Sequence, residues 1–414
     1  MQKKYVMANR KKFMKQMKNG SIAVIHSNTM YISSQDMFYD FEPDREFFYL
    51  TGVSEPGFIF LAAKLNDEIV QKLFVYRKDE YEEKWTGYRL SEEEIKEFSG
   101  IVEVHPIDSF NAVFAMMMDQ GYKNIYFNVK CGAKKYIDYI TPQELLAQEI
   151  LRKYPYLTVL NSAEITVPLR SIKSAYEINM IREAVAVTNR GILRMMKSAK
   201  PGINERELRA GFEYEVIRAG MKVSFNSIIA GGENALVLHY EDNNQEVSGG
   251  EMVLCDVGAA NNMFCADVTR TFPINGKYTP QQRSIYDIVL RANEAVIDYI
   301  KPGVTFKELE ALAKAVMAKG LMELGIMDEA KYISKYYYHN IGHGLGLNAH
   351  DPTDKNVPLK EGMVITVEPG LYVRQFGVGV RIEDDVLVTK NGCEVLTGGI
   401  IKHPDDIEKF MSKR

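Results

Sequence analysis

The sequence predicts a protein of the mixed α/β (α+β) class that is built from two domains. In the first ~165 residues, short β-rich runs alternate with helical stretches, which is typical of an α/β domain. From Ser171 onward, long amphipathic helical stretches separate pairs of strand-like runs. The chain has 414 residues, of which 46% are hydrophobic, so it can bury a core in each domain.

The first part of the chain is predicted to contain short strands and helices in alternation. Runs of β-branched and aromatic residues indicate strands at Ile22–His26, Phe47–Thr51, Phe58–Ala62, Leu73–Tyr76 and Ile125–Asn128. Apolar residues at helical spacing indicate helices at Ser91–Phe98, Ser109–Gln120 and Pro142–Lys153. The change in pattern places the boundary near Val167–Arg170, which gives domains at 1–167 and 168–414.

The second part is predicted to contain long helices joined in pairs. They are expected at Ser174–Ala199, Asn204–Ala219, Pro280–Ile300 and Phe306–Leu324. Each pair is joined by Lys-Pro-Gly, at 200–202 and again at 301–303, and Asn204 and Thr305 are the expected N-caps that follow.

Further matches indicate that the second part contains an internal duplication. The run at 251–254 parallels the run at 362–365, and each leads to an acidic residue. His239 and His350 each lie 13 residues before the methionine of its run. Because the matches keep the same order, we expect two half-sites that face each other across one central cleft.

Composition and charge argue against some classes of partner and indicate a cellular compartment. A net charge of −4 and an isoelectric point near 6.1 give no reason to expect nucleic acid or an anionic membrane as a partner. No apolar run approaches the ~20 residues of a membrane span, and no apolar stretch follows the basic N-terminus as it does in a secretion signal. The cysteines lack Cys-x-x-Cys spacing, so we expect reduced thiols of a cytoplasmic protein at Cys131, Cys255, Cys265 and Cys393.

Four carboxylates and one histidine in the second part indicate a two-metal hydrolytic centre. Asp256 ends one apolar run and Asp267 begins the next, so both are expected on neighbouring strands of a hairpin with its loop near 259–263. Glu368 ends another apolar run, and Glu383 begins a further one. Buried carboxylates raise one another's pKa, so such a group stays ionised only with cations between its members.

The donor types indicate which metal ion is bound. Oxygen-rich ligation with one imidazole and no thiolate suits Mn²⁺, with Co²⁺, Fe²⁺ or Zn²⁺ as competitors. Two such ions ~3.5–4 Å apart can activate water and polarise a carbonyl group together. The sequence therefore predicts two Mn²⁺ ions per chain.

The segment His339–Asp351 carries three of the seven histidines and is glycine-rich. His339 and His343 are four residues apart, but the glycines around them argue against a helix that carries both. The HExxH pattern of the zincins is absent, and the glycines do not form a dinucleotide-binding motif. We expect them to let the backbone pass close to the centre.

In these motifs the chain resembles the pita-bread metallopeptidases, and within them aminopeptidase P and prolidase. The resemblance covers nearly the whole chain. The matching stretches are Ile229–Tyr240, the Asp256/Asp267 hairpin, His339–Asp351, Glu368–Tyr372, Gly379–Asp385 and, in the first part, Asp36 with Arg45–Gly52. The resemblance implies an amino-terminal domain of the aminopeptidase P type, followed by a catalytic domain with a pseudo-twofold repeat and a curved antiparallel sheet.

The resemblance also implies how the ions are held. Asp256 would chelate one ion, and Asp267 and Glu383 would bridge the two. His343 and Glu368 would hold the other ion. Glu368 would in addition exchange protons with a hydroxide activated between the two Mn²⁺ ions.

Three further histidines are implied to line the substrate cleft. They are His239, His339 and His350. His339 would lie close to the scissile amide and would stabilise the oxyanion of the tetrahedral intermediate.

A proton relay beside the site is implied as well. Arg381 would pair with a ligand carboxylate from the strand face that bears Glu383, and Asp36 and Tyr372 would belong to the relay. Close relatives carry an arginine soon after the segment His339–Asp351. In this chain Lys355 is the only cation in that stretch, and whether it replaces the arginine stays open.

The function that the resemblance implies is metal-dependent hydrolysis of the N-terminal Xaa-Pro bond of peptides. Prolidase, which acts on Xaa-Pro dipeptides, is the alternative. A non-catalytic relative that binds partners, or a creatine-type amidinohydrolase, would lack the five ligands, and methionine aminopeptidase normally lacks a first domain. Trp85 lies in a segment that in this family reaches a neighbouring subunit, which implies a homodimer or homotetramer.

Overall fold

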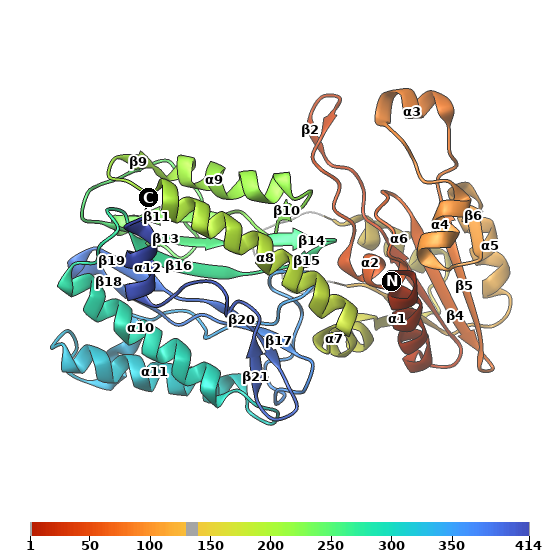
Figure 1. Cartoon of the computed structure of the whole chain (residues 1–414). Coiled ribbons are helices and arrows are strands. Elements are labelled where there is room, and N and C mark those ends of the chain that lie inside the picture. The colour runs from red at the N-terminus through yellow and green to blue at the C-terminus, as the bar shows by residue number, and fades with distance from the viewer. Residues whose placement is uncertain (1, 130–139, 414) are drawn as a thin grey trace. The chain divides into compact units, whose positions relative to one another are not determined.

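The computed structural model describes residues 2–129 and 140–413, and it confirms the mixed class of helices and sheets (Figure 1). The chain divides into two compact units, Met1–Leu169 and Arg170–Arg414. None of the described helices is long and apolar enough to cross a membrane. Cys255 and Cys393 are free thiols, whereas Cys131 lies outside the described residues.

The first unit is built on a mixed six-stranded sheet in the order β6-β5-β4-β1-β7-β8. The central strand β1 pairs antiparallel with β4 and parallel with β7. A parallel pair of strands needs a crossover connection, which is typical of an α/β domain. The strands are β1 Ser21–His26, β4 Ile59–Leu65, β5 Glu68–Val75, β6 Glu103–Pro106, β7 Asn124–Phe127 and β8 Thr158–Asn161; a separate hairpin is formed by β2 Ile32–Ser34 and β3 Met37–Phe38.

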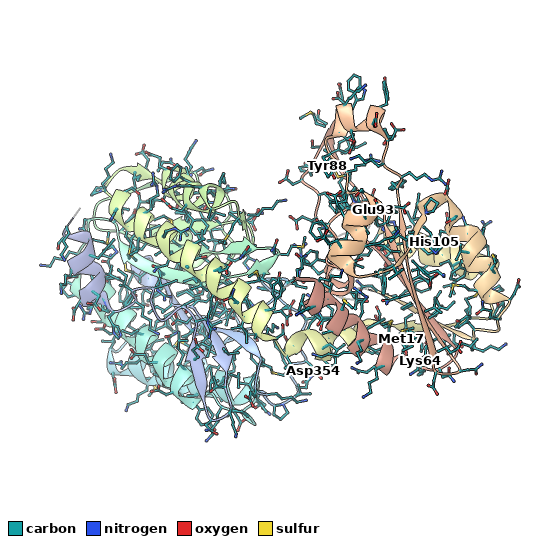
Figure 2. All side chains as sticks on the ribbon, turned by 45° about the vertical axis from the view of Figure 1, so that its right-hand side comes forward. Met17, Lys64, Tyr88, Glu93, His105 and Asp354 are labelled. Carbon is teal, nitrogen blue, oxygen red and sulfur yellow. The ribbon has the colours of Figure 1, made fainter. Side chains whose placement is uncertain are left out.

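Helices cover this sheet and supply its core. Phe110 and Phe114 of α5 and Ile150 of α6 pack on the buried side chains of the strands. At one end of the sheet, Lys64 of β4 donates to the carbonyl of Met17 just after α1 (3.2 Å; Figure 2). The helices are α1 Gln2–Gln16, α2 Arg45–Thr51, α3 Glu80–Thr86, α4 Glu92–Ser99, the 3₁₀ turn η1 Ile107–Ser109, α5 Phe110–Met118, α6 Pro142–Lys153 and α7 Ala163–Ser171.

The strand predicted at Phe47–Thr51 is wrong, because these residues form most of helix α2. Asp44 caps the helix by accepting hydrogen bonds from the backbone of Glu46 and Phe47. Gly52 ends it in the left-handed conformation at φ 68°. The aromatic run favours a strand, but the caps at both ends decide for the helix.

The second unit contains the predicted pairs of long helices, in which α8 packs on α9 and α10 packs on α11. Asn204 and Thr305 are the N-caps, as expected, and each forms a reciprocal capping box with the glutamate three residues later. The helices are α8 Ala175–Ser198, α9 Glu205–Arg218, η3 Gly232–Leu236, α10 Pro280–Tyr299, α11 Phe306–Glu323, η4 Ala330–Lys335, η5 Arg374–Phe376 and α12 Pro404–Met411.

Between the helices run short antiparallel sheets, in the orders β11-β13-β16, β10-β14-β15, β17-β20-β21, β18-β19 and β12-β9. Strands β11, β16, β17, β18, β19 and β20 are buried along their whole length, whereas β10, β12 and β21 each have an exposed residue. The bounds are β9 Ile203–Asn204, β10 Lys222–Val223, β11 Ile228–Gly231, β12 Glu246–Val247, β13 Met252–Val257, β14 Ala259–Asn261, β15 Phe264–Cys265, β16 Val268–Pro273, β17 Val364–Val367, β18 Gly370–Val373, β19 Val378–Arg381, β20 Asp384–Val388 and β21 Cys393–Val395.

The hairpin that carries the two aspartates is present, with a shorter loop than expected. Strands β13 and β16 pair antiparallel and bring Asp256 opposite Thr269. The expected loop at 259–263 is largely strand, because β14 and β15 extend the hairpin. The chain reverses at Asn262 and Met263, which have φ of 47° and 68°.

Candidate functional site

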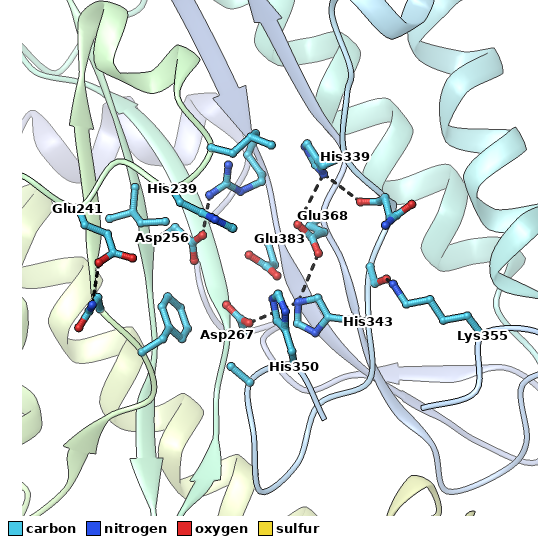
Figure 3. Close-up of a pocket in the computed structure, with 18 residues that line it drawn as sticks. His239, Glu241, Asp256, Asp267, His339, His343, His350, Lys355, Glu368 and Glu383 are labelled. Atoms are coloured by element: carbon cyan, nitrogen blue, oxygen red, sulfur yellow. Dashed lines mark hydrogen bonds and ion pairs between the residues drawn. The ribbon is translucent and has the colours of Figure 1, made fainter. Parts of the chain in front are cut away.

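A cavity of about 520 Å³ lies in the second unit and gathers the chemistry-bearing side chains (Figure 3). Every metal-ligand candidate named from the sequence lines it, namely Asp256, Asp267, His343, Glu368 and Glu383. His239, His339, His350 and Arg381 line it as well.

The strand ends hold the carboxylates in place. Asp256 lies on β13, and Asp267 directly precedes β16 on the neighbouring strand. Glu368 directly follows β17, and Glu383 directly precedes β20, which pairs with β17. The four therefore face the cavity from adjacent strand ends, and this is why they alternate with buried apolar residues in the sequence.

The glycine-rich segment brings His343 against the carboxylates. Its Nε2 atom lies 3.4 Å from Glu368 Oε1 and 3.7 Å from Asp267 Oδ2. The segment is not helical, as expected, and its glycines permit close backbone contact. A Cβ atom on Gly342 would lie 2.1 Å from the carbonyl oxygen of Thr366, which belongs to the strand leading to Glu368.

The protonation of these groups fits a site for cations. Burial, together with the charge of Glu383, raises the pKa of Asp267 well above its usual range. Burial also raises the pKa of Glu368 to about 7. The buried Oδ1 atom of Asp256 accepts no hydrogen bond from the described residues. A cation would relieve each of these penalties.

The histidine tautomer supports the same conclusion. Burial lowers the pKa of His343 to about 3, so its imidazole is neutral. Its Nδ1 atom lies 3.1 Å from the carbonyl of Gly344, which assigns the proton to Nδ1 and a lone pair to Nε2. That lone pair faces carboxylate oxygens, an arrangement that repels unless a cation lies between them. Among the described residues, Asp267, His343 and Glu383 have one ligand atom each within 4.8 Å of one another.

A chain of polar contacts leads from Asp256 to His339. Arg381 Nη2 lies 2.6 Å from Asp256 Oδ2, which is the kind of contact with a carboxylate that the resemblance implies for Arg381. Arg381 Nη1 donates to the Tyr372 hydroxyl at 2.9 Å, and that hydroxyl lies 2.9 Å from His339 Nε2. Because Arg381 already donates to Tyr372, the tyrosine is left to donate to His339.

Arg381 and Glu383 do not share a strand, which corrects the expected basis of their proximity. Strand β19 ends at Arg381, and Glu383 lies in the connection before β20. Thr269 links the two instead. Its hydroxyl donates to Glu383 Oε2 at 2.7 Å and accepts from Arg381 Nε at 3.1 Å.

The two remaining relay candidates lie in different places. Asp36 is exposed in the turn between β2 and β3 of the first unit, and its share in a relay stays a prediction. Lys355 lines the cavity of the second unit, and its ammonium group donates to the carbonyl of Gly342 at 2.7 Å. This hydrogen bond helps to hold the segment that carries His343 in place.

Sequence reasoning missed part of the cavity wall. Phe225, Asn226 and Glu241 line it, and Asn226 donates to the Glu241 carboxylate at 2.7 Å. Glu241 follows His239 by two residues, and this was the only signal available. An apolar or amide side chain on a short connection carries no periodic pattern that marks it as part of a cavity.

Comparison with known proteins shows the same two-part organisation. Residues 179–390 match the model of metallopeptidase family M24, and residues 6–126 match that of the aminopeptidase P N-terminal domain. The Xaa-Pro aminopeptidase of Escherichia coli is 33% identical over 429 residues, which cover 97% of this chain and 96% of the relative.

Solved structures give the same result. A protein from Bacillus anthracis that has been described as a candidate aminopeptidase P superposes with a TM-score of 0.97 at 38% identity, covering 100% of this chain and 99% of that one. Proline aminopeptidase P II of Yersinia pestis superposes with a TM-score of 0.91 at 32% identity, covering 100% of both chains.

A mixed fold with a carboxylate-rich cavity and these matches define a metal-dependent hydrolase. The chain belongs to metallopeptidase family M24. The expected pita-bread architecture and the resemblance to aminopeptidase P are thereby confirmed.

Proposed function

We propose that this enzyme is a metal-dependent exopeptidase that releases the residue before proline from the N-terminus of peptides, with two Mn²⁺ ions per chain. The observation that carries the proposal is the convergence of Asp256, Asp267, His343, Glu368 and Glu383 on one cavity. Co²⁺, Fe²⁺ or Zn²⁺ fit the same donors. The relatives named for Xaa-Pro cleavage, which match along almost their whole length, support the substrate class.

The proposed roles follow from the contacts in the cavity. Asp256, Asp267, His343, Glu368 and Glu383 would hold the ions, which when bound would activate water to hydroxide and polarise the scissile carbonyl group. Glu368, whose carboxylate lies 3.4 Å from His343 Nε2 and 3.7 Å from His339 Nδ1, would in addition accept and return a proton during the reaction.

The residues around the ligands would orient the substrate and handle protons. His339 Nδ1 lies 3.7 Å from Glu368 Oε2, and its other nitrogen meets Tyr372. It therefore lies between a proton acceptor and the polar chain to Arg381. His239 and His350 on the cavity wall would contact the substrate.

Proline is a reasonable target for such a cavity. An Xaa-Pro bond has no N–H and a fixed φ, so proteases that bind substrates as strands reject it. The cavity offers imidazole faces together with the apolar side chains Phe225, Ile228 and Leu238. These surfaces suit a pyrrolidine ring, which has no polar group of its own to satisfy.

The metal-reconstituted enzyme is expected to cleave Ala-Pro-Ala more efficiently than Ala-Pro. A strict dipeptidase needs a cation that binds the substrate's carboxylate and a loop that closes over it. The connection from Glu368 to Glu383 is the short hairpin β18–β19. Arg374, at its tip, is exposed and lies outside the cavity lining. Steady-state kinetics on both peptides test this, and a kcat/KM that favours the dipeptide about tenfold or more would identify a prolidase.

We also propose that the chain forms a homodimer or homotetramer through α3 and the β2–β3 hairpin of the first unit. Trp85 is 78% exposed, Tyr81 68% and Tyr88 64%. Ile32 and Met37 of the hairpin are 64% and 63% exposed. Such large apolar side chains in water mark an interaction surface. Sedimentation equilibrium should give an oligomer that Trp85→Ser weakens, and a wild-type monomer would contradict the proposal.

The compartment is proposed as the cytoplasm. Cys255 is free and buried, and Cys393 is free and partly buried. Reduced thiols of this kind are typical of a reducing compartment.

A further inference from the structure

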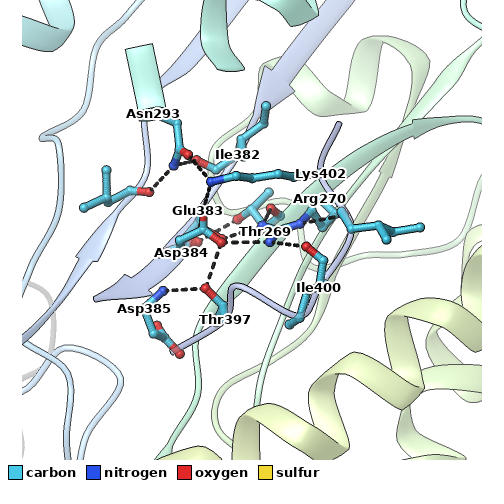
Figure 4. A network of polar contacts seen from close by, with 12 residues as sticks. Thr269, Arg270, Asn293, Ile382, Glu383, Asp384, Asp385, Thr397, Ile400 and Lys402 are labelled. Atoms are coloured by element: carbon cyan, nitrogen blue, oxygen red, sulfur yellow. Dashed lines mark hydrogen bonds and ion pairs between the residues drawn. The ribbon is translucent and has the colours of Figure 1, made fainter. Parts of the chain in front are cut away.

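One buried side chain binds the backbone beside both glutamates of the site. Asn293 of α10 is fully buried, and its amino group donates to the carbonyl of Val367 at 3.2 Å and to the carbonyl of Ile382 at 3.4 Å (Figure 4). These two residues directly precede Glu368 and Glu383. A single amide therefore holds the main chain at both ligand positions.

These two contacts lie at the end of the ladder that joins β17 and β20. The ladder between β17 and β20 ends with the pair Val367 and Asp384. One step further, Glu368 and Glu383 would face each other, but no ladder pairing joins them. Beyond the ladder, the backbone N–H of Ile382 donates to the carbonyl of Pro369 at 3.3 Å, and the amide of Asn293 adds a second link between the same two segments.

Lys402 fixes which way that amide points. Its ammonium group lies 2.8 Å from Asn293 Oδ1 and 2.8 Å from Asp384 Oδ2. A flipped amide would turn its amino group toward the ammonium group and its oxygen toward two carbonyls, so only the observed orientation satisfies all the groups. Asn293 is therefore locked as a donor to both ligand positions.

Arg270 also belongs to this network of polar contacts. It donates to the carbonyl of Glu383 at 2.6 Å and to Asp384 Oδ1 at 2.8 Å, and Asp384 also accepts from Thr397 at 2.7 Å. The asparagine and Lys402 do not line the cavity. A buried ionic network contributes little net stability compared with apolar packing, so stability alone does not account for it.

We propose that Asn293 and Lys402 are positioning residues that fix the spacing of Glu368 and Glu383 and thereby set the affinity of the site for its metal ions. The inference rests on the proposed function, because it requires that the two glutamates bind cations. When a residue that orients a metal ligand without touching the metal is replaced, the affinity for the metal typically falls strongly.

The test compares the metal-free wild type with Asn293→Leu, which keeps a side chain of similar length without donors, and with Lys402→Met. Calorimetric titration with Mn²⁺ should show dissociation constants raised about 10- to 100-fold in both variants. Gln282→Leu is the matched control on the same helix, since Gln282 donates to the carbonyl of Gly250 and neither residue lines the cavity. It should lower the midpoint of thermal unfolding and leave the Mn²⁺ dissociation constant unchanged.

The result that overturns the inference is wild-type Mn²⁺ affinity in a folded variant, or an equal loss of affinity in the Gln282 control. If Asn293→Leu does not fold, the Mn²⁺ affinity of Lys402→Met tests the inference. Lys402 is partly exposed at the edge of the network, so its replacement is expected to disturb folding less. Lys402→Arg, which retains a cation, should recover most of the affinity. A wild type that binds no Mn²⁺ would instead overturn the proposed function and this inference with it.

Discussion

Asp267→Asn is expected to reduce peptidase activity to the level of the metal-free protein while the chain still folds. An amide supplies no negative charge to balance cations, and the carboxylate of Asp267 has an oxygen within 4.8 Å of ligand atoms of both His343 and Glu383. The substitution also removes a carboxyl group whose pKa is raised by its burial and by repulsion from Glu383 and Asp256. The metal-free variant should therefore be at least as stable as the metal-free wild type.

Two measurements check this expectation. Thermal unfolding with and without Mn²⁺ should show a rise in Tm for the wild type and little or none for the variant. Asp287→Asn on the surface of α10 is the matched control, since it changes the same group in an ion pair with Arg283 away from the cavity. Near-wild-type turnover in Asp267→Asn, or in a wild type freed of metal by a chelator, would contradict the two-metal proposal.

His339→Ala is expected to lower kcat by about a hundredfold or more without loss of metal. The His339 imidazole lies 3.7 Å from Glu368, but both of its nitrogens have other partners: Nδ1 lies 2.9 Å from the carbonyl of Asn340 and Nε2 lies 2.9 Å from the Tyr372 hydroxyl. Burial lowers the pKa of His339 to about 3, so the imidazole is neutral at assay pH. The variant thus loses a neutral hydrogen-bonding partner, and its pH profile should keep the wild-type shape.

Elemental analysis separates this role from that of a ligand. His339→Ala should retain the metal content of the wild type, whereas His343→Ala should lose one ion per chain. A His339 variant that loses an ion would make His339 a ligand. A variant with unchanged kcat would remove it from the reaction altogether.

Much of the fold was readable from local patterns. The capping signals at Asn204 and Thr305 located the starts of α9 and α11, because a cap acts within a few residues of itself. The apolar runs that end in acidic residues predicted where Asp256 and Glu368 lie. The wrong strand prediction at 47–51 also has a local cause. The aromatic run there favours a strand, whereas the caps Asp44 and Gly52 favour the helix that forms.

Short runs of sequence are enough to identify which residues could bind metal and which strand ends carry them, because strand burial and ligand chemistry are both local properties. Which of these residues meet depends on the packing of the whole second unit. Arg381 reaches Asp256 across 125 residues of chain, and Asn293 reaches Val367 across 74. No periodicity encodes such pairs, because they depend on how complete helices and strands pack, and an asparagine in the middle of a helix looks the same in sequence whether it faces water or two ligand carbonyls.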